Sequence, residues 1–226
     1  MFFAIGFGMI YCKLTNVAVS LLNEKENTET FWVVLIIQDV ILPTICKEVI
    51  MSKLSLIHGS CADQTADAVV NAANSGLWEG SGICGVIFSK CGSAELAQEC
   101  SKYQTPIKDG NAVITSACKM KNAKYIIHAV GPDFRITPTA FLELFNAYYN
   151  SLVQLKDNNL HSISFPLISS GVFAGKLPNP AGESAKQCGR AYKKFVQDYP
   201  DYEIDVMLCA FKPNEFQDAQ SALSAL

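Results

Sequence analysis

Residues 80–85 read Gly-Ser-Gly-Ile-Cys-Gly, a set of residue types and a spacing that could bind a phosphate group. Glycines in the pattern GxGxxG let backbone N–H groups approach phosphate oxygens, and a helix that begins there adds partial positive charge. Cys84 places a thiol at the same helix N-terminus, where a thiolate can be stabilised. With no His near it in the sequence, we expect a small packed thiol rather than a nucleophile. The hexapeptide on its own is most often a structural turn.

A nicotinamide site is one chemistry that this pattern could serve. A dinucleotide-binding Rossmann unit needs the first Gly to end the first strand, and an acidic residue to end a second strand about 20 positions later. Here residues 74–79 separate the preceding apolar run from Gly80, and no acidic residue stands at the end of a second run. We therefore expect no nicotinamide and no other cofactor.

Other polar blocks stand where apolar runs end. The block DAVVNAAN (residues 67–74) leads into the glycine-rich segment, and FPLISSGVF (165–173) follows later. Two shorter blocks, NAVIT (111–115) and IHAVGP (127–132), lie between them. Ligands of open α/β sheets bind outside the carboxyl ends of the strands, so these blocks are candidates for one shared site.

Six short apolar runs, each bounded by polar residues, Gly or Pro, are typical of buried strands. Helical periodicity lies between them, and one helix has an Asn cap followed by Pro at its first turn, at Asn179-Pro180. This alternation predicts an α/β fold with three layers, α/β/α, around a mixed, mostly parallel sheet of about six strands. The predicted strands are 54–58, 68–71, 112–116, 125–130, 162–168 and 204–211, and the predicted helices cover 83–91, 141–155 and 181–195, with a last one from about 214.

Composition excludes several classes of protein. The chain has 226 residues, a formal net charge of -3 and 50% apolar residues, so it can bury a sizeable core. No run of Lys and Arg provides the electrostatic footprint of a nucleic-acid-binding protein, so no nucleic acid is expected. The 9 cysteines form no CxxC pair and the 3 histidines have no metal-ligand spacing. We expect reduced, mostly buried thiols in a cytoplasmic protein, and no metal.

Residues 1–50 differ from the rest and form an N-terminal extension of uncertain status. Their apolar runs are shorter than the ~18–20 residues of a membrane span, and no basic start or cleavage site indicates a signal peptide. The segment is either an extra hairpin or helix packed on the domain, or a stretch preceding a natural start at Met51, which we favour slightly. The main domain is then 51–226, with no membrane association expected.

The four polar blocks occur in the order and spacing of a macrodomain. From about Leu54 to Phe211 the sequence resembles the bacterial macrodomain family, whose members bind ADP-ribose and often remove it from proteins. The resemblance implies the three-layer fold predicted above. It implies nothing about residues 1–50, whose removal we expect to leave ADP-ribose affinity unchanged.

The resemblance also implies roles for individual residues. The two loops at 80–85 and 169–173 would clamp the diphosphate through backbone N–H groups. Asn74 would bind the distal ribose and is the expected catalytic residue, whereas Asn71 is either a second polar site residue or, as we favour, a structural one. Phe173 would pack beside that ribose and Phe211 beside the adenine, although such aromatics are more often part of a core. The expected ligand-binding residues are Ser60, Cys61, Asn74, Gly80, Ser81, Gly82, Ile83, Cys84, Gly85, Ser169, Ser170, Gly171, Val172, Phe173 and Phe211.

Three positions depart from the family pattern. Ser60 stands where an Asp usually accepts a hydrogen bond from the adenine amino group, and a hydroxyl accepts less strongly. Cys84 replaces the Asp that positions the attacking water in many hydrolytic relatives, while viral-type relatives also lack it and still hydrolyse ester-linked ADP-ribose. The Gly that usually follows the loop aromatic is Ala174 here, and Gly175 comes one place later. This shift could give the loop a different shape.

The preferred function is hydrolysis of ester-linked mono-ADP-ribose on proteins, or deacetylation of O-acetyl-ADP-ribose, by a cytoplasmic monomer. The substrate's own phosphate would orient the water. The enzyme would then accelerate the reaction by positioning the reactants and by preorganised dipoles, and not with a strong base. The alternative is a non-catalytic reader of ADP-ribose or ADP-ribosylated proteins, which the departures at Ser60 and Cys84 favour. A third hypothesis, recognition of another nucleotide diphosphate, follows from the weaker adenine contact at Ser60.

Overall fold

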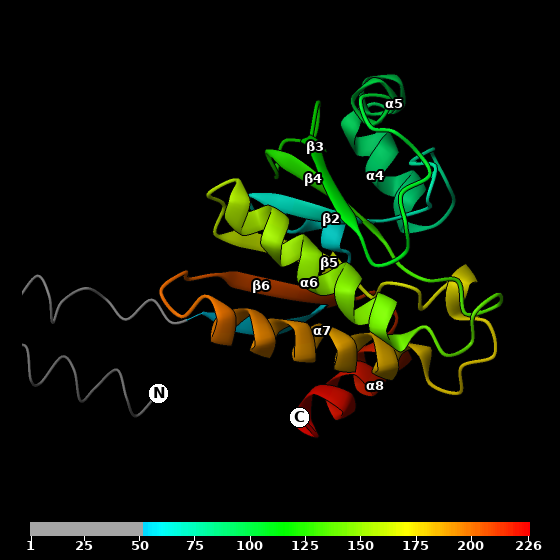
Figure 1. The fold of residues 1–226 in the computed structure, drawn as a ribbon, viewed down its shortest axis with the longest axis vertical. Coiled ribbons are helices and arrows are strands. Elements are labelled where there is room, and N and C mark those ends of the chain that lie inside the picture. The colour runs from blue at the N-terminus through cyan, green and yellow to red at the C-terminus, as the bar shows by residue number, and fades with distance from the viewer. Residues whose placement is uncertain (1–51) are drawn as a thin grey trace, which may run out of the picture. The chain divides into compact units, whose positions relative to one another are not determined.

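The computed structural model describes residues 52–226, so the expectations for residues 1–50 lie outside the described part of the chain. Its centre is a six-stranded sheet in the order β1-β6-β5-β2-β4-β3, in which every neighbouring pair is parallel except the antiparallel β3–β4 pair (Figure 1). The predicted mixed, mostly parallel sheet is confirmed. The strands are β1 (Lys53–His58), β2 (Ala68–Ala73), β3 (Ala112–Ser116), β4 (Tyr125–Val130), β5 (Ser162–Pro166) and β6 (Asp205–Ala210).

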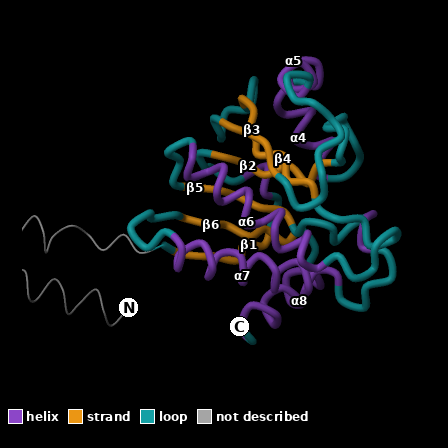
Figure 2. The backbone as a smooth tube through the Cα atoms, in the orientation of Figure 1, coloured by secondary structure: helices purple, strands orange, loops and turns teal. Residues whose placement is uncertain are grey.

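Helices cover both faces of the sheet, which confirms the three-layer arrangement (Figure 2). One face packs against α6 (Phe141–Asp157), α7 (Pro180–Asp198) and α8 (Pro213–Ser224). The other packs against α4 (Ile83–Cys91) and α5 (Ser93–Cys100). Within residues 52–226, no helix has both the length and the apolar character that a bilayer crossing requires.

Strand β2 illustrates why the strands read as continuous apolar runs. Ala68 and Val70 point into the core under α6 and α7, while Val69 and Ala73 point into the core under α4. Successive side chains of a strand alternate between faces, so a strand covered on both sides needs apolar residues at nearly every position. Asn71 interrupts the run and is nevertheless buried, with 1% of its surface exposed.

Helix boundaries follow local chemistry. Asn179 caps α7 by accepting a hydrogen bond from the Gly182 N–H at 2.8 Å, and Pro180 opens its first turn, as predicted. Gly92, at φ 85°, ends α4 as predicted. Helix α5 was not predicted, because it is short and only Leu96 and Cys100 of its residues are buried, which leaves too weak a period to recognise.

The predicted strand 162–168 ends two residues early, at Pro166, and a buried tyrosine binds the backbone where the chain leaves the sheet. The Tyr148 hydroxyl lies 3.2 Å from the Pro166 carbonyl oxygen, accepts a hydrogen bond from the Ile168 N–H at 2.9 Å and pairs with the Ser184 hydroxyl at 2.7 Å. Ser184 in turn donates to the Ile168 carbonyl at 2.7 Å. This hub fixes where the loop after β5 begins.

Replacing Tyr148 with Phe removes the hub's central hydroxyl and leaves the buried Ile168 N–H without its acceptor. We expect the free energy of unfolding to fall by about 1–3 kcal/mol, the usual effect of an unsatisfied buried group. Urea denaturation measures it. The matched control is Tyr149→Phe, because the Tyr149 hydroxyl makes a surface hydrogen bond to Asp198. Equal losses in the two variants would contradict the role of the hub.

Candidate ligand-binding site

A cavity of about 720 Å³ opens at the carboxyl ends of the strands. Residues that directly follow β1, β2, β5 and β6 reach it, as expected for the edge at which parallel strands end. It brings together fourteen of the fifteen residues predicted to bind the ligand, from three separate segments and Phe211. Those lining it are Ser60, Cys61, Asn74, Gly80, Ser81, Gly82, Ile83, Cys84, Ser169, Ser170, Gly171, Val172, Phe173 and Phe211.

Gly85 is the predicted residue that does not line this cavity. A Cβ atom at Gly85 would lie only 2.8 Å from the Gly80 carbonyl oxygen. Glycine at this position therefore permits close packing of the loop against the first turn of α4. Its contribution to a ligand site would be indirect, through the shape of the loop.

The glycine-rich loop places several backbone amides at one end of a helix. Gly82 is the N-cap of α4 at φ 62°, a left-handed conformation that favours glycine. The first N–H groups of a helix have no acceptor within the helix, and Ser81, Gly82 and Ile83 line the cavity. This arrangement suits an anion whose oxygens accept from the backbone.

The loop after β5 is held by its own polar groups. Ser169 adopts φ 58° and its hydroxyl donates to the Pro132 carbonyl at 2.8 Å, while the Ser170 hydroxyl donates to the Leu167 carbonyl at 2.8 Å. Gly175 has φ 59°, and a Cβ there would meet the Phe134 backbone at 2.7 Å. Glycine is thus required at 175, whereas Ala174 is buried in a short 3-10 helix (Val172–Ala174).

The charges at the cavity rim are already paired. Lys212 is the basic residue among those that line the cavity, and its ammonium lies 2.8 Å from a carboxylate oxygen of Glu215, another lining residue. The backbone N–H of Lys212 also donates to Glu215 at 3.2 Å. The backbone N–H groups of the two loops are therefore the further donors that the cavity could offer to an anion.

The side chain of Asn74 organises its own loop and faces the cavity. Its Oδ1 accepts from the N–H groups of Gly76 and Trp78, each at 3.2 Å, and its Nδ2 donates to the Trp78 carbonyl at 2.8 Å. An amide nitrogen carries two hydrogens, so one remains to bind a ligand hydroxyl. Asn74 therefore has both a structural role and a free donor.

Trp78 lines the cavity and was not predicted. Its side chain is 64% exposed, and its ring lies over Gly76 so closely that a Cβ there would be 1.7 Å from the ring. An aromatic residue within a polar segment, between the NAAN block and the glycine-rich loop, was the signal that could have identified it. The other unpredicted lining residues are Gly59, Ala72, Val86, Pro166, Leu167, Cys209, Lys212 and Glu215.

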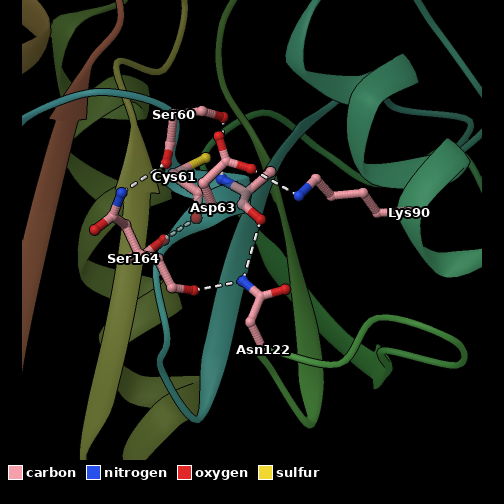
Figure 3. Close-up of polar contacts among 8 residues, drawn as sticks. Ser60, Cys61, Asp63, Lys90, Asn122 and Ser164 are labelled. Atoms are coloured by element: carbon pink, nitrogen blue, oxygen red, sulfur yellow. Dashed lines mark hydrogen bonds and ion pairs between the residues drawn. The ribbon is translucent and has the colours of Figure 1, made fainter.

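The turn after β1 also contributes to the cavity lining, and Figure 3 shows the polar contacts that hold this turn. The Ser60 Oγ accepts from the Ala62 N–H at 3.3 Å and caps the 3-10 turn η2 (Cys61–Asp63). The Ser164 hydroxyl donates to the Cys61 carbonyl at 2.6 Å, and Asp63 pairs with Lys90 at 2.7 Å. The Ser60 hydroxyl can still accept one further hydrogen bond. Phe211, 71% exposed, lines this cavity after β6.

A buried polar network lies behind the glycine-rich loop. Asn71 Nδ2 is 3.2 Å from His128 Nδ1 and 3.6 Å from Cys84 Sγ, and His128 Nε2 is 2.9 Å from the Thr115 hydroxyl. Burial lowers the pKa of His128 to about 4, so the imidazole is neutral at physiological pH. The favoured structural role of Asn71 agrees with its burial, but its contact with Cys84 joins it to a residue of the cavity.

The sheet order, the helices on both faces and the cavity at the strand ends define an α/β ligand-binding domain. Residues 70–182 match the Macro domain family. The chain is 37% identical over 162 residues to the O-acetyl-ADP-ribose deacetylase of Salmonella typhimurium, across 70% of this chain and 87% of that protein. The chain belongs to the macrodomain family.

Further relatives and solved structures agree with this assignment. The mouse ADP-ribose glycohydrolase MACROD1 is 37% identical over 161 residues, and the match covers 70% of this chain and 48% of the mouse protein. An uncharacterized Thermotoga maritima protein is 35% identical over 161 residues, and the match covers 70% of this chain and 26% of that protein. The chain therefore spans half or less of these two longer proteins. The Oceanobacillus iheyensis macrodomain with ADP superposes with a TM-score of 0.69 at 30% identity, across 77% of this chain and 91% of that one.

The neutral His128 predicts a pH dependence of stability. Its pKa is about 4 in the folded protein and about 6.5 when exposed, so the unfolded chain binds the proton first as the pH falls. We expect the free energy of unfolding to decrease by up to about 3 kcal/mol between pH 6.5 and 4. Urea titrations across this range measure it.

His128→Gln should flatten that slope, because it removes the titrating group. His161→Gln is the control, since His161 is exposed. A slope that is unchanged in His128→Gln, or lost in His161→Gln, would contradict the assignment.

Proposed function

We propose that this protein binds ADP-ribose and hydrolyses ester-linked mono-ADP-ribose from proteins, or the acetyl ester of O-acetyl-ADP-ribose. The observation that carries the proposal is the single cavity in which both predicted diphosphate loops, Asn74 and Phe211 meet. The printed activities of two relatives, an ADP-ribose glycohydrolase and an O-acetyl-ADP-ribose deacetylase, support a hydrolytic reaction.

The two loops would hold the diphosphate without a salt bridge. Residues 81–84 would supply amides at the start of α4, and residues 169–173 would supply a second set from a loop held in place by side-chain hydrogen bonds. Hydrogen bonds from fixed N–H groups to an anion are stronger than those to neutral acceptors. The adenine would then lie beside Phe211, with its amino group near Ser60.

The same loops would contribute to catalysis by holding the substrate in position for attack by water. With the diphosphate fixed, the free Nδ2 hydrogen of Asn74 would bind a hydroxyl of the distal ribose and hold the ester at the cavity's inner end. A water oriented by the substrate's phosphate would attack the ester carbonyl carbon, and the loop dipoles would stabilise the negative charge that develops. Cys84 stands where many hydrolytic relatives would supply a carboxylate.

A non-catalytic reader is the second candidate. Ser60 and Cys84 replace two carboxylates of the family pattern, and both changes remove groups that would otherwise contact substrate or water. A domain that retains its binding loops and loses its water-positioning group would bind ADP-ribose or ADP-ribosylated proteins without turnover.

We also propose a bacterial-type, cytoplasmic setting and a monomeric state. Seven cysteines among residues 52–226 are free thiols and six of them are buried. Free buried thiols are typical of proteins kept in a reducing compartment. Analytical ultracentrifugation tests the oligomeric state directly.

Asn74→Ala separates the two functions. In a hydrolase, the variant should lose turnover of a protein mono-ADP-ribosylated on Asp or Glu, because the ribose is no longer held; in a reader, ADP-ribose affinity should fall only in part. Release of ADP-ribose and calorimetric binding are measured together, with Asn158→Ala, a residue outside the cavity, as the control. Release retained in Asn74→Ala would contradict the role of Asn74. Tight binding without release by the unmodified protein would identify a reader.

Phe211→Ala tests the adenine contact. Stacking of a base on an aromatic ring contributes about 1–3 kcal/mol, so ADP-ribose affinity should fall by about 5- to 150-fold. Calorimetry with ADP-ribose and with a pyrimidine nucleotide diphosphate sugar measures the effect, and Leu142→Ala, an exposed residue of α6, is the control. Equal affinity of the unmodified protein for both ligands would favour recognition of a different nucleotide diphosphate.

A further inference from the structure

A second cavity, of about 600 Å³, shares part of its wall with the ligand cavity. Gly171 and Val172 line both cavities. The other residues of the second cavity come from two short segments, 134–138 and 175–177. Its volume lies within the range of about 300–1,000 Å³ that is typical of ligand-binding pockets. A molecule that fills the ligand cavity could therefore extend over the shared wall into a second pocket.

Backbone contacts hold the two segments of the second cavity together. The Phe134 N–H donates a hydrogen bond to the Phe173 carbonyl at 2.9 Å. A Cβ atom at Gly175 would lie 2.7 Å from the Phe134 carbonyl carbon and 2.9 Å from the Arg135 backbone nitrogen. Because only glycine permits this approach, the fold itself forms the wall, and no ligand is needed to shape it.

Arg135 connects the second cavity to the expected position of the distal ribose. Its Nε donates to Asp133 Oδ1 at 2.9 Å and its Nη2 donates to Asp133 Oδ2 at 2.6 Å. The guanidinium carbon also lies 5.4 Å from the centre of the Phe173 ring, a cation–π contact. In the proposed binding mode Phe173 packs beside the distal ribose, which carries the ester. A polypeptide joined to that ester would leave the ligand cavity over Gly171 and Val172.

The second cavity offers one positive charge that has no partner. Arg135 and Lys176 are its charged lining residues, and Asp133 already pairs with Arg135. Lys176 is exposed, and no carboxylate within residues 52–226 lies at ion-pair distance from its ammonium. The complementary group on a ligand is therefore a carboxylate.

Exposed apolar side chains surround the same cavity. Val172 is 66% exposed, and Ile136, which lies between the lining residues Arg135 and Pro138, is 80% exposed. Pro138 is exposed as well, and Leu177 is half-buried. Single exposed apolar residues are common on protein surfaces, whereas a group of them around a cavity is typical of a surface that binds another protein.

We propose that the second cavity binds the acceptor polypeptide, which is the segment of an ADP-ribosylated protein beside its modified Asp or Glu. An apolar residue of that segment occupies the cavity, and an acidic residue pairs with Lys176. This inference rests on the proposed binding of ADP-ribose and names its substrate class. A protein-linked ester contacts both cavities, whereas O-acetyl-ADP-ribose contacts the ligand cavity alone.

Lys176→Glu in the full-length protein tests the proposal, because it reverses an exposed charge outside the ligand cavity. The probe is a peptide that is ADP-ribosylated through a Glu ester, with Leu and Asp beside the modified residue. We expect kcat/KM for release of ADP-ribose from this peptide to fall by about tenfold, because an attraction is lost and a repulsion is gained. Added salt should reduce the difference. The kcat/KM for O-acetyl-ADP-ribose and the affinity for free ADP-ribose should not change.

Lys121→Glu is the matched control. Lys121 is also exposed and also has no ion pair in the part of the chain that the structure describes. It precedes β4, which runs parallel to β2, so it lies at the edge of the sheet away from the ligand cavity. This variant should change neither reaction.

Ile136→Ser tests the apolar part of the proposed contact. Loss of this exposed side chain should lower kcat/KM for the peptide ester by about fivefold, because less apolar surface is buried in the complex. The reaction with O-acetyl-ADP-ribose is the internal control and should keep its rate.

An unchanged kcat/KM for the peptide ester in Lys176→Glu would overturn the proposal and leave the proposed hydrolysis standing. An equal fall for the peptide ester and O-acetyl-ADP-ribose would do the same, because the second cavity would then belong to the ADP-ribose site. Loss of a dimer in Lys176→Glu, seen by analytical ultracentrifugation, would identify a second copy of the chain as the occupant and would also overturn it.

Failure of the proposed hydrolysis is a separate outcome. If the unmodified protein releases ADP-ribose from neither substrate, calorimetry with the intact peptide ester and with free ADP-ribose measures the same contact. A loss of affinity in Lys176→Glu that is confined to the peptide ester would support docking of the acceptor polypeptide in a reader. Equal affinities of Lys176→Glu and the unmodified protein for the peptide ester would overturn it.

Discussion

The anion recognition that we propose for this domain would depend on backbone N–H groups, because Lys212 at the cavity rim is already paired with Glu215. Backbone donors cannot be repositioned by a change of rotamer, so the loops that carry them have to be built into the fold. Gly82 provides the left-handed turn that starts α4, and Gly175 allows the second loop to approach the Phe134 backbone closely. The shape of the site is thus a property of the main chain.

The loop after β5 shows how the core determines that shape. Tyr148 on α6 and Ser184 on α7 bind the backbone of residues 166–168 from within the core. Their hydroxyls satisfy polar groups that leave the sheet ladder when β5 ends, and burial makes each of these hydrogen bonds costly to lose. Packing of two helices against the sheet is therefore coupled to the position of residues at the cavity.

Much of this architecture could be predicted from the sequence. The strands 112–116 and 125–130 and the helix 83–91 have the predicted bounds, since each is a distinct apolar run closed by polar residues or glycine. Of the predicted ligand-binding residues, only Gly85 falls outside the cavity. Helix α5, the ring of Trp78 over Gly76 and the contact of His128 with Asn71 were not predicted. The last of these joins residues 57 positions apart, which local periodicity does not reveal.

That unpredicted contact also joins Cys84 to a buried network. The sequence favoured a packed thiol because no His is near it, and Cys84 is 5% exposed; β2 and β4 pair Asn71 with His128 in register, and Asn71 reaches the sulfur. Asn71 therefore couples the buried imidazole of His128 on β4 to Cys84, a residue of the cavity wall. A change in the packing around His128 would reach the glycine-rich loop through these contacts.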